Sequence, residues 1–487
     1  MALEDIRNER VRKRAMLFEQ GVNPYPATTR RTHTVGEVLK KFVALATGKK
    51  KVAIVGRIMA KREHGGAAFF DVQDESGKMQ ILMKRDILGD EQYDRVIATV
   101  DIGDFVGAEG ILFETKRGEK TLEVKQWTML GKSLLPLPEK WHGLQDVEER
   151  FRKRYLDLIM NEEVRERFRM RSAIITFIRK FHEKNGFLEV ETPTFHAIPG
   201  GTLAKPFVTH QNALDIDLYL RIAKELYLKR LLVGGFERIY EIGKDFRNEG
   251  MDATHSPEFT MLECYAAYWD EEDMMAFVED IFCGLVKEFF GGSEVEQDGK
   301  QIVFKKPFAR ITFKDLLARY ALIPDYEAET RDSLAMRARQ LGVEAAPHES
   351  KGKIADEIYK KICRPYLIQP TFLVHHPRDI SPLSKKWEDH PSEVRRFQLV
   401  ANGLELTNAF AELNDPIDQR ERFEEQGQSR EGGDDEAHRF DEEFIEALEY
   451  GMPPAAGLGI GIDRLIMFLT NQKNIREVVL FPTMRPK

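Results

Sequence analysis

The sequence predicts an α+β protein in which a small β-barrel domain precedes a larger domain that mixes helices and strands. Two patterns support this fold class. Five β-rich segments, with one helix-like segment among them, fall within residues 51–130, and helix-like and strand-like segments then mix toward the C-terminus. The chain of 487 residues is long enough for about two to four domains with buried cores.

Composition indicates a globular protein that neither spans a membrane nor carries a secretory signal. Apolar residues make up 42% of the chain and charged residues 32%, and no apolar run approaches the roughly 18 residues that a spanning helix needs. The N-terminus is charged at once, unlike a secretory signal. Three widely spaced cysteines predict neither a disulfide framework nor a zinc site. We therefore expect a cytoplasmic protein without a membrane partner.

The net charge of −8 is unevenly distributed along the chain. Residues 412–449 hold 15 acidic and 4 basic side chains, so the rest of the chain is slightly positive. Basic stretches at residues 7–14 and 49–62 lie near the N-terminus. A solvated surface explains such runs as well as a nucleic-acid partner does, so the negative net charge does not exclude nucleic acid.

The N-terminal elements predict an OB-type barrel. Residues 1–20 form a basic helix that ends at Gly21, within an N-terminal segment 1–26. The expected strands lie at residues 51–59, 67–73, 78–83, 104–114 and 121–130, with a helix at 87–98. Five strands with a helix after the third are typical of the OB-fold. We assign residues 27–133 to this domain and the proline-rich residues 134–140 to a linker.

The second strand of this barrel carries a candidate contact with nucleic acid. The period of two places Phe69, Asp71 and Gln73 on one face, where they offer a ring for stacking and an amide for a base edge. Barrels of this kind bind single-stranded nucleic acid by stacking bases on aromatic side chains. Either Phe69 or Phe70 is expected in the core instead, because neighbours in a strand point to opposite faces.

The larger domain is assigned to residues 141–487. Its helical stretch at residues 161–184 ends at Asn185-Gly186, and a strand with alternating apolar residues then runs into Pro193. A more polar helical stretch at about residues 310–365 is interpreted as an insertion.

The two familiar nucleotide-binding motifs are absent. Gly131-Lys132-Ser133 resembles the end of a P-loop, but Gln126 stands where that motif has its first glycine. The glycine-rich residues 457–461 lack the third glycine of a dinucleotide fingerprint. These glycines still let a ligand approach the backbone, with Arg464 following at a helix start, although such glycines more often serve close packing.

Residues 246–263 hold a dense cluster of charged, aromatic and turn residues, which suits two strands joined by a loop. Arg247 offers paired donors to phosphate, Glu249 can accept from an exocyclic amine, and Phe259 offers a flat face to a purine. This set fits ATP. In isolation, the same residues more often form a salt-bridged hairpin with a core phenylalanine.

A third cluster lies at residues 403–415. Alternation predicts a strand with Glu405 and Thr407 on one side and Asn408, Phe410 and Glu412 on the other. Glu405 and Glu412 would line one cavity only if a bulge or the strand end followed Asn408. Exposure to solvent is the default for either glutamate.

Together these motifs resemble the class II aminoacyl-tRNA synthetases, in particular the bacterial-type lysyl-tRNA synthetases of subclass IIb. The three signature motifs correspond to the helix and strand that end at Pro193 and to residues 246–263 and 457–465. The resemblance covers nearly the whole chain, with further matches at residues 152–159, 200–201, 219–223, 408–415 and 450–454. It implies a catalytic antiparallel sheet with flanking helices, a homodimer formed through motif one, and an OB-fold domain that binds the anticodon.

The resemblance further implies that ATP activates L-lysine to lysyl-adenylate and that the lysyl group then passes to the 3′-end of tRNA(Lys). Arg247 corresponds to the residue that holds the α-phosphate and the substrate carboxylate. Glu249 and Phe259 correspond to adenine contacts, and His255 and Arg464 to contacts with the terminal phosphate. Positioning and positive charge carry such chemistry, so we expect no covalent enzyme intermediate.

Mg²⁺ is the cofactor that the resemblance implies, with Glu405 as its ligand. Many family members have a second glutamate seven residues earlier, where this chain has Gln398. A neutral amide binds Mg²⁺ less well than a carboxylate, because this hard cation prefers charged oxygen. The number of bound ions is therefore left open.

For the amino acid, the resemblance implies a pocket with carboxylate partners, since an ammonium group buried without a partner is costly. Glu225 and Glu412 correspond to partners of the side-chain amine, aided by the Tyr265 hydroxyl. The other counterparts are Glu263 at the α-amine, Asn408 at the carboxylate, Phe410 along the aliphatic chain and Gly201, whose backbone faces the ligand. In the OB-fold domain, Phe69 corresponds to an aromatic that stacks on an anticodon base and Gln73 to an amide that reads the central base.

Two rival functions are open at this point. An aspartyl- or asparaginyl-tRNA synthetase shares the OB-fold domain and the class motifs, but Glu225 and Glu412 argue against an acidic substrate. The second rival is a relative that lacks catalysis or that modifies a protein instead of tRNA. Arg247 and Arg464 argue against a relative that lacks catalysis, and the OB-fold domain argues against one that modifies a protein.

Overall fold

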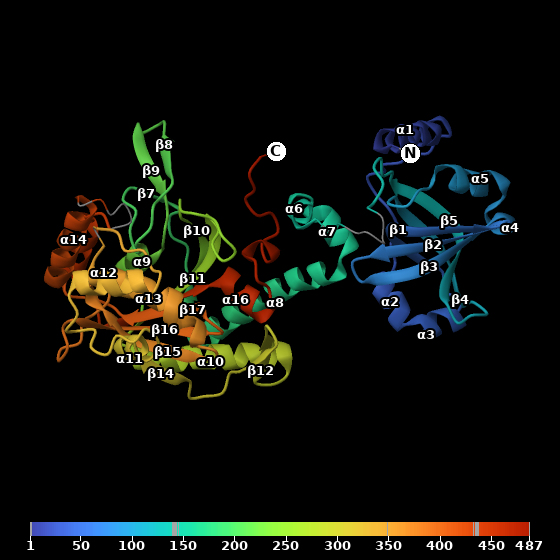
Figure 1. Ribbon diagram of the computed structural model, residues 1–487. Helices are drawn as coiled ribbons and strands as arrows, with labels where there is room; N and C mark the ends of the chain where they lie inside the picture. The colour runs from blue at the N-terminus through green and yellow to red at the C-terminus, as the bar shows by residue number, and fades with distance from the viewer. Residues whose placement is uncertain are drawn as a thin grey trace. The chain divides into compact units, whose positions relative to one another are not determined.

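The computed structural model describes residues 2–138, 144, 146–347, 349–431, 433 and 438–486. It divides into two compact units, Met1–Gln145 and Asp146–Lys487, both drawn in Figure 1. Residues 139–140 of the predicted linker and 141–143 of the predicted larger domain lie outside the described residues. Among the described residues, no helix has the length and apolar character needed to cross a membrane.

The first unit contains a five-stranded barrel, closed in the order β1-β2-β3-β5-β4. β5 pairs parallel with β3 and antiparallel with β4, and β4 returns to β1. Its elements are α1 (Leu3–Glu19), α2 (Val35–Lys40), α3 (Phe42–Thr47), β1 (Val52–His64), β2 (Ala67–Asp74), β3 (Gly77–Lys84), α4 (Arg85–Leu88), α5 (Asp90–Thr99), β4 (Phe105–Glu114) and β5 (Lys120–Gly131). Because helices follow the third strand, the predicted OB-type barrel is confirmed.

Side chains of β2 alternate between the inside and the outside of the barrel. Ala68, Phe70 and Val72 are fully buried in the barrel core. Phe69 lies on the outer face and is partly exposed. Of the two neighbouring phenylalanines, Phe70 is therefore the core residue, and Phe69 is available to a ligand.

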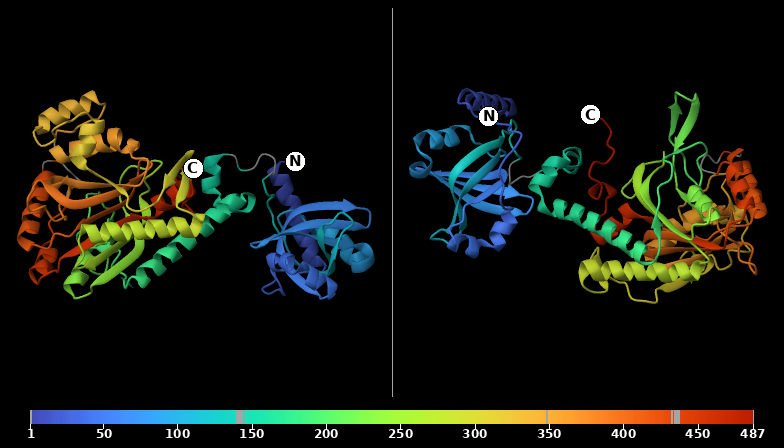
Figure 2. Two further views of the ribbon diagram at one scale, coloured as in Figure 1. Left: turned by 90° about the horizontal axis from the view of Figure 1, so that it is seen from below. Right: turned by 180° about the vertical axis from the view of Figure 1, so that it is seen from behind.

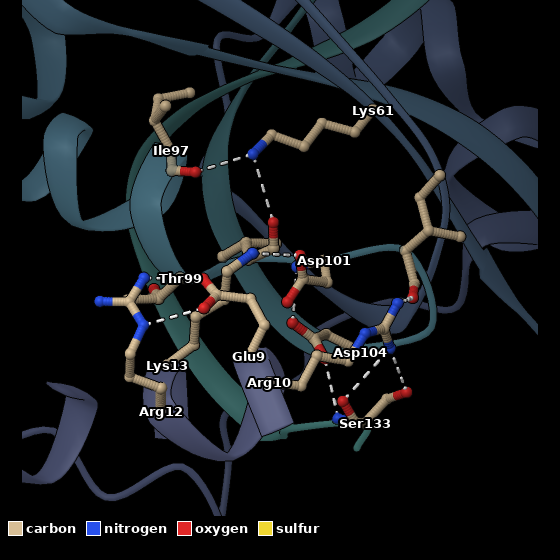
Figure 3. A network of polar contacts seen from close by, with 12 residues as sticks. Glu9, Arg10, Arg12, Lys13, Lys61, Ile97, Thr99, Asp101, Asp104 and Ser133 are labelled. Atoms are coloured by element: carbon tan, nitrogen blue, oxygen red, sulfur yellow. Dashed lines mark hydrogen bonds and ion pairs between the residues drawn. The ribbon is translucent and has the colours of Figure 1, made fainter. Parts of the chain in front are cut away.

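Helix α1 is held on the barrel mainly by polar contacts, since Arg10 and Leu17 are its only buried residues among those described. Figure 3 shows the Arg10 guanidinium beside Ser133, and Nη1 donates to Ser133 Oγ at 2.8 Å. The same guanidinium donates to the carbonyls of Leu135 and Ile102, both at 3.0 Å. A buried charge is stable only when it is well paired, and these acceptors give α1 a defined position on the barrel.

The second unit is built on an eight-stranded sheet in the order β14-β15-β16-β17-β18-β11-β10-β6. Neighbouring strands run antiparallel except for the edge pairs β14–β15 and β10–β6. The strands are β6 (Leu188–Glu189), β10 (Arg238–Phe246), β11 (Glu258–Ala267), β14 (Ala309–Thr312), β15 (Thr371–Pro377), β16 (Glu393–Ala401), β17 (Leu404–Ala411) and β18 (Ala455–Gly461). The predicted antiparallel sheet is thereby confirmed.

One face of this sheet packs on α8 (Glu162–Lys184), α10 (Glu271–Phe290) and α16 (Ile462–Leu469) to form the main apolar core. Alternate strand residues, such as Leu262 and Leu458, point into this core. Figures 1 and 2 show α8 and α10 side by side. The intervening strand residues point to the opposite side, which carries the candidate site.

The predicted insertion at residues 310–365 packs around a core of its own. Its helices are α11 (Phe313–Tyr320), α12 (Arg331–Gln340), α13 (Lys351–Ile358) and the one-turn elements η1 (Tyr359–Cys363) and η2 (Arg364–Tyr366). Their apolar side chains also contact Leu373 and Val400 of the sheet, so this segment is fixed to β15 and β16.

The remaining elements complete the second unit. They are α6 (Val147–Arg152), α7 (Arg154–Met160), β7 (Phe195–His196), β8 (Val208–Gln211), β9 (Ile216–Leu220), α9 (Glu225–Val233), β12 (Glu294–Gln297), β13 (Lys300–Val303), η3 (Arg378–Ile380), α14 (Pro416–Glu431), α15 (Glu442–Glu449) and η4 (Ile475–Glu477). Helices α9, α14 and α15 share a smaller apolar core. This core fixes α9 beside β11.

Candidate active site

The open side of the sheet brings three distant segments of the sequence into register. One row across β17, β18 and β11 consists of Asn408, Gly459 and Glu263. A second row consists of Phe410, Gly457 and Tyr265. The predicted motif segments therefore meet on one surface, and alternation along each strand decides which side chains they present.

A bulge in β17 brings Glu405 onto the same surface. β16 and β17 shift register between the residues that pair with Thr407 and with Glu405. Leu406 is the extra residue of this bulge, and it is buried in the main core. From the sequence, Glu405 and Glu412 could share one side only with a bulge or strand end after Asn408, whereas the bulge in the structure lies before Asn408.

The glycines of β18 keep this surface open where side chains crowd it. A Cβ atom at Gly457 would collide with Glu412 and lie 2.5 Å from the Tyr265 ring. A Cβ atom at Gly461 would meet nothing closer than 3.9 Å. Position 457 therefore requires glycine, and position 461 does not require it for reasons of space.

A cavity of about 400 Å³ lies over these strands. The predicted site residues that line it are Gly201, Glu225, Arg247, Glu249, His255, Phe259, Gln398, Glu405, Asn408, Phe410 and Arg464. Glu263, Tyr265 and Glu412 are not among its lining residues, and they are 5%, 4% and 1% exposed. The structure thus gathers most of the predicted contacts around one cavity and buries three of them behind its wall.

Two arginines, Arg247 and Arg464, line the cavity. The Arg247 guanidinium lies over the Phe259 ring, with Cζ 5.0 Å from the ring centroid. Burial and the charge of Arg247 both lower the pKa of Arg464, while the Glu405 carboxylate opposes the change. Two guanidinium groups that line one cavity favour an anion there, and the planar forks of arginine suit phosphate oxygens.

The Arg464 side chain is held by hydrogen bonds on the loop between β10 and β11. Its Nη2 lies 2.8 Å from His255 Nε2. Arginine can only donate, so His255 Nε2 accepts, and His255 Nδ1 donates to Asp252 at 2.8 Å. These contacts fix the histidine tautomer and keep both side chains at the cavity.

Asp463 positions the start of α16, and with it Arg464. Its Oδ2 accepts a hydrogen bond from the Thr260 backbone nitrogen at 2.7 Å. Its Oδ1 lies 2.6 Å from Arg171 Nη1. The two contacts join α16 to β11 and to α8, which explains why a charged residue is buried at this point.

Gln398 belongs to a hydrogen-bond chain and does not present a free oxygen to the cavity. The Tyr359 hydroxyl donates to Gln398 Oε1 at 3.2 Å, and Gln398 Nε2 donates to Glu405 Oε2 at 3.1 Å. An ionised carboxylate only accepts, so the amide nitrogen must face Glu405. The amide oxygen is therefore turned toward the buried Tyr359.

Glu405 fits the chemistry of a magnesium ligand that acts together with a nucleotide. Among the described residues, no group of three or more His, Cys, Asp or Glu side chains is arranged to hold a metal ion. Mg²⁺ is commonly bound through one or two carboxylates plus substrate phosphates. The Glu405 carboxylate suits that mode, whereas the amide of Gln398 does not.

Arg396 sets the orientation of the Asn408 amide. Its Nε donates to Asn408 Oδ1 at 2.8 Å, and its Nη1 donates to Ser381 Oγ at 2.9 Å. The Asn408 amide nitrogen is thus left to donate to a ligand in the cavity. The sequence analysis missed Arg396, although its place two residues before Gln398 puts it on the same face of β16.

Glu263 is held behind the cavity by two donors. The Lys224 backbone nitrogen donates to it at 3.0 Å and the Tyr265 hydroxyl at 3.3 Å. Burial raises the pKa of Glu263 to about 7, while the Lys224 ammonium opposes that rise. Lys224 itself pairs with Asp245 at 2.8 Å.

Glu225 and Glu412 share a lysine of this chain. Lys229 Nζ lies 2.6 Å from Glu225 Oε1 and 2.5 Å from Glu412 Oε2. Burial raises the pKa of both carboxyl groups, and the Lys229 ammonium opposes that rise. The sequence analysis missed Lys229, although it lies four residues after Glu225, a spacing that predicts an ion pair on a helix.

On the barrel, Phe69, Asp71 and Gln73 share the outer face of β2, as predicted. Asp71 accepts a hydrogen bond from Arg62 at 3.0 Å, which adds a basic side chain to this face. Gln80 lies opposite Asp71 on β3 and so diagonally beside Phe69, about 7–8 Å away. Gln73 is about 13 Å along the strand from Phe69. Gln80, which the sequence analysis did not select, is thus the amide closer to the ring.

Because Gly457 is crowded and Gly461 is not, alanine should destabilise the protein more at position 457 than at position 461. Gly457→Ala should lower the free energy of unfolding of this unit by about 1–3 kcal/mol, because a methyl group meets Glu412 and Tyr265 without room to relax. Gly461→Ala is the matched control and should change it much less. Urea unfolding of the full chain measures both, and equal effects of the two substitutions would contradict this account of β18.

Comparison with known proteins agrees with this geometry. The family description "tRNA synthetases class II (D, K and N)" matches residues 146–485, and "OB-fold nucleic acid binding domain" matches residues 52–130. A lysine–tRNA ligase of Roseiflexus sp. (strain RS-1) is 50% identical over all of this chain and all of its own length. Those of Moorella thermoacetica and Carboxydothermus hydrogenoformans are 49% and 48% identical over all of this chain and 99% of their own. The chain therefore belongs to the class II tRNA synthetases of the D, K and N group, in the same family as these lysine–tRNA ligases.

Proposed function

We propose that this protein is a lysine–tRNA ligase, which activates L-lysine with ATP to lysyl-adenylate and transfers the lysyl group to the 3′-end of tRNA(Lys). The observation that carries the proposal is a single cavity lined by Arg247, Arg464 and Glu225. Glu412 is buried behind its wall and shares Lys229 with Glu225. Full-length similarity to proteins named lysine–tRNA ligase supports the choice of amino acid. It disfavours an aspartyl or asparaginyl enzyme and a non-catalytic relative.

In the first step, a carboxylate oxygen of lysine attacks the α-phosphorus of ATP and pyrophosphate leaves. Both reactants are negative, so a cation between them lowers their repulsion. Arg247 is proposed to bind the α-phosphate and the lysine carboxylate, with Glu249 and Phe259 at the adenine. Arg464 and His255 are proposed to bind the terminal phosphate. Positioning and charge stabilisation then supply the catalysis, without a side-chain nucleophile.

Mg²⁺ is proposed as the cofactor, with Glu405 as its protein ligand. When bound, the ion neutralises charge on the phosphate oxygens of the nucleotide. Gln398 is proposed to orient the Glu405 carboxylate through its amide nitrogen and not to ligate the metal. This role explains why position 398 carries an amide and not a second carboxylate that would bind the metal.

The lysine substrate is proposed to lie across β17 and β11. Asn408 donates to the carboxylate, Glu263 accepts from the α-ammonium, and Gly201 lines the cavity with its backbone. Phe410 lies along the aliphatic chain. Glu225 and Glu412 bind the side-chain ammonium, near the Tyr265 hydroxyl. Since Glu263, Tyr265 and Glu412 lie behind the cavity wall, this part of the pocket must open slightly to admit the substrate.

The barrel is proposed to bind the anticodon of tRNA(Lys). Phe69 would stack on one base, with Gln73 at the central base and Gln80 as the amide nearer the ring. Exposed bases that stack on an aromatic side chain contribute about 1–3 kcal/mol each to binding. Arg7, Arg12 and Arg14 of α1 add positive charge for the RNA backbone.

Two further features of the whole protein belong to the same proposal. We propose that the enzyme works as a homodimer formed through the motif-one segment, which comprises α8 and the strand that follows it. We also propose a cytoplasmic location, because its three cysteines are free and translation takes place in that compartment.

Glu412→Gln tests the assignment of the lysine pocket. The substitution should raise KM for lysine about 100-fold or more, because the substrate ammonium would be buried without a free carboxylate partner. KM for ATP should stay within about twofold. Lysine-dependent exchange of pyrophosphate into ATP measures both constants.

The control for this variant is Glu421→Gln, an exposed glutamate on α14, which should behave like the wild type. The wild-type protein should also show exchange with lysine and not with the other nineteen amino acids. Exchange that depends on aspartate or asparagine would reject the proposal, as would equal effects of Glu412→Gln on the lysine and ATP constants.

Gln398→Glu tests the proposed metal site. A second carboxylate beside Glu405 should bind Mg²⁺ together with ATP, and the Mg²⁺ concentration for half-maximal exchange should fall several-fold. Mn²⁺ binding in the presence of ATP, followed by electron paramagnetic resonance, should show tighter binding than in the wild type. An unchanged Mg²⁺ requirement and unchanged Mn²⁺ binding would show that this position does not tune the metal site.

A further inference from the structure

The cluster of Glu225, Lys229 and Glu412 is a buried group of charges that does not balance. The side chains of Lys229 and Glu412 are fully buried, and that of Glu225 is 8% exposed. When both carboxyl groups are ionised, these three side chains carry one net negative charge, and the charge of Arg396 acts on Glu225 from outside the group. A buried net charge is costly unless another charge compensates it. The cluster is therefore one positive charge short of neutrality.

Lys229 is firmly held in this cluster. Its ammonium group contacts both carboxylates and lies 3.5 Å from the Leu383 carbonyl oxygen, which gives each of its three N–H groups an acceptor. It also lies 5.4 Å from the centroid of the Phe410 ring, within range of a cation–π contact. These contacts indicate that Lys229 stays in place when a ligand arrives.

The two glutamates, in contrast, retain capacity for a second cation. Glu412 Oε1 is buried and has no hydrogen-bond partner in the part of the chain that the structure describes. Glu225 lines the cavity. A second ammonium group entering from the cavity would therefore find carboxylate oxygens that Lys229 does not use, and it would make the cluster neutral.

We propose that Lys229 sets the charge requirement of the lysine side-chain subsite, because it neutralises one of the two glutamates and leaves a single negative charge for one further ammonium group. This inference rests on the function proposed above. Lys229 acts through Glu225 and Glu412 and is thus a positioning residue that determines specificity.

The proposal has a consequence that a purely structural role would not have. In Glu412→Gln, Lys229 and Glu225 form a neutral pair, so the substrate ammonium finds no free carboxylate and is repelled by Lys229. If Lys229 is also replaced by methionine, Glu225 becomes available to the substrate. The second substitution should therefore restore part of the binding that the first one removes.

The experiment compares the wild type, Lys229→Met, Glu412→Gln and the double variant by lysine-dependent pyrophosphate exchange. KM for lysine of the double variant should be about tenfold or more below that of Glu412→Gln. KM for ATP should agree within about twofold in all four proteins. Lys244→Met, which removes a half-exposed lysine paired with Glu258, is the matched control. Added to Glu412→Gln, it should leave KM for lysine unchanged.

A KM for lysine in the double variant equal to or above that of Glu412→Gln would overturn the proposal and leave Lys229 with a structural role. The same comparison with Glu225→Gln should show the same rescue. Thermal unfolding checks that each variant is folded; where the methionine variants are unstable, Lys229→Gln removes the charge and keeps a hydrogen-bond donor, with the same expected rescue. If the wild type itself does not activate lysine, the proposed function fails, and this result is distinct from failure of the charge inference.

Discussion

Burial of two like charges beside each other is the constraint on which the catalytic unit depends. Glu225 begins α9 and Glu412 follows β17, and a glutamate at either position would ordinarily face water. The apolar core shared by α9, α14 and α15 removes that water. Lys229 bridges the two carboxylates, and under the proposed function the remaining negative charge makes the pocket selective for a cation. Stability and recognition thus rest on the same group of charges.

The sheet supplies the geometry that this charge cluster needs. Antiparallel pairing places Asn408 and Phe410 opposite glycines of β18, so that ligand and side chains share one surface without crowding. The bulge in β17 turns Glu405 to the same surface. Asp463 fixes α16 to β11, which holds Arg464 at the cavity. Glu225, Glu405 and Arg464 are therefore carried by helices and strands, which limits the reorganisation that catalysis requires.

Much of this could be predicted from the sequence, because alternation and turn residues are local signals. They predicted the barrel, its five strands and that Phe69, Asp71 and Gln73 share one face. Local signals could not decide between Phe69 and Phe70, since the choice depends on which face meets the core. They also could not show that Gln398 bonds to Tyr359, a contact between the insertion and the sheet.

The site residues that belong to a known motif could be predicted from the sequence. The balance of charge among them could not. In the sequence, Lys229 is an ordinary residue of an amphipathic helix. Only the fold brings Glu412, which follows a distant strand, into contact with it. The position of the β17 bulge and the burial of Glu263 and Tyr265 likewise follow from tertiary packing.

A crystal structure with lysine and a non-hydrolysable ATP analogue bound tests the central claim most directly. The account predicts the ligand's side-chain nitrogen within hydrogen-bond distance of Glu225 or Glu412, with Lys229 still bridging the two carboxylates. A ligand nitrogen in bulk solvent, or Lys229 displaced from both glutamates, would contradict it.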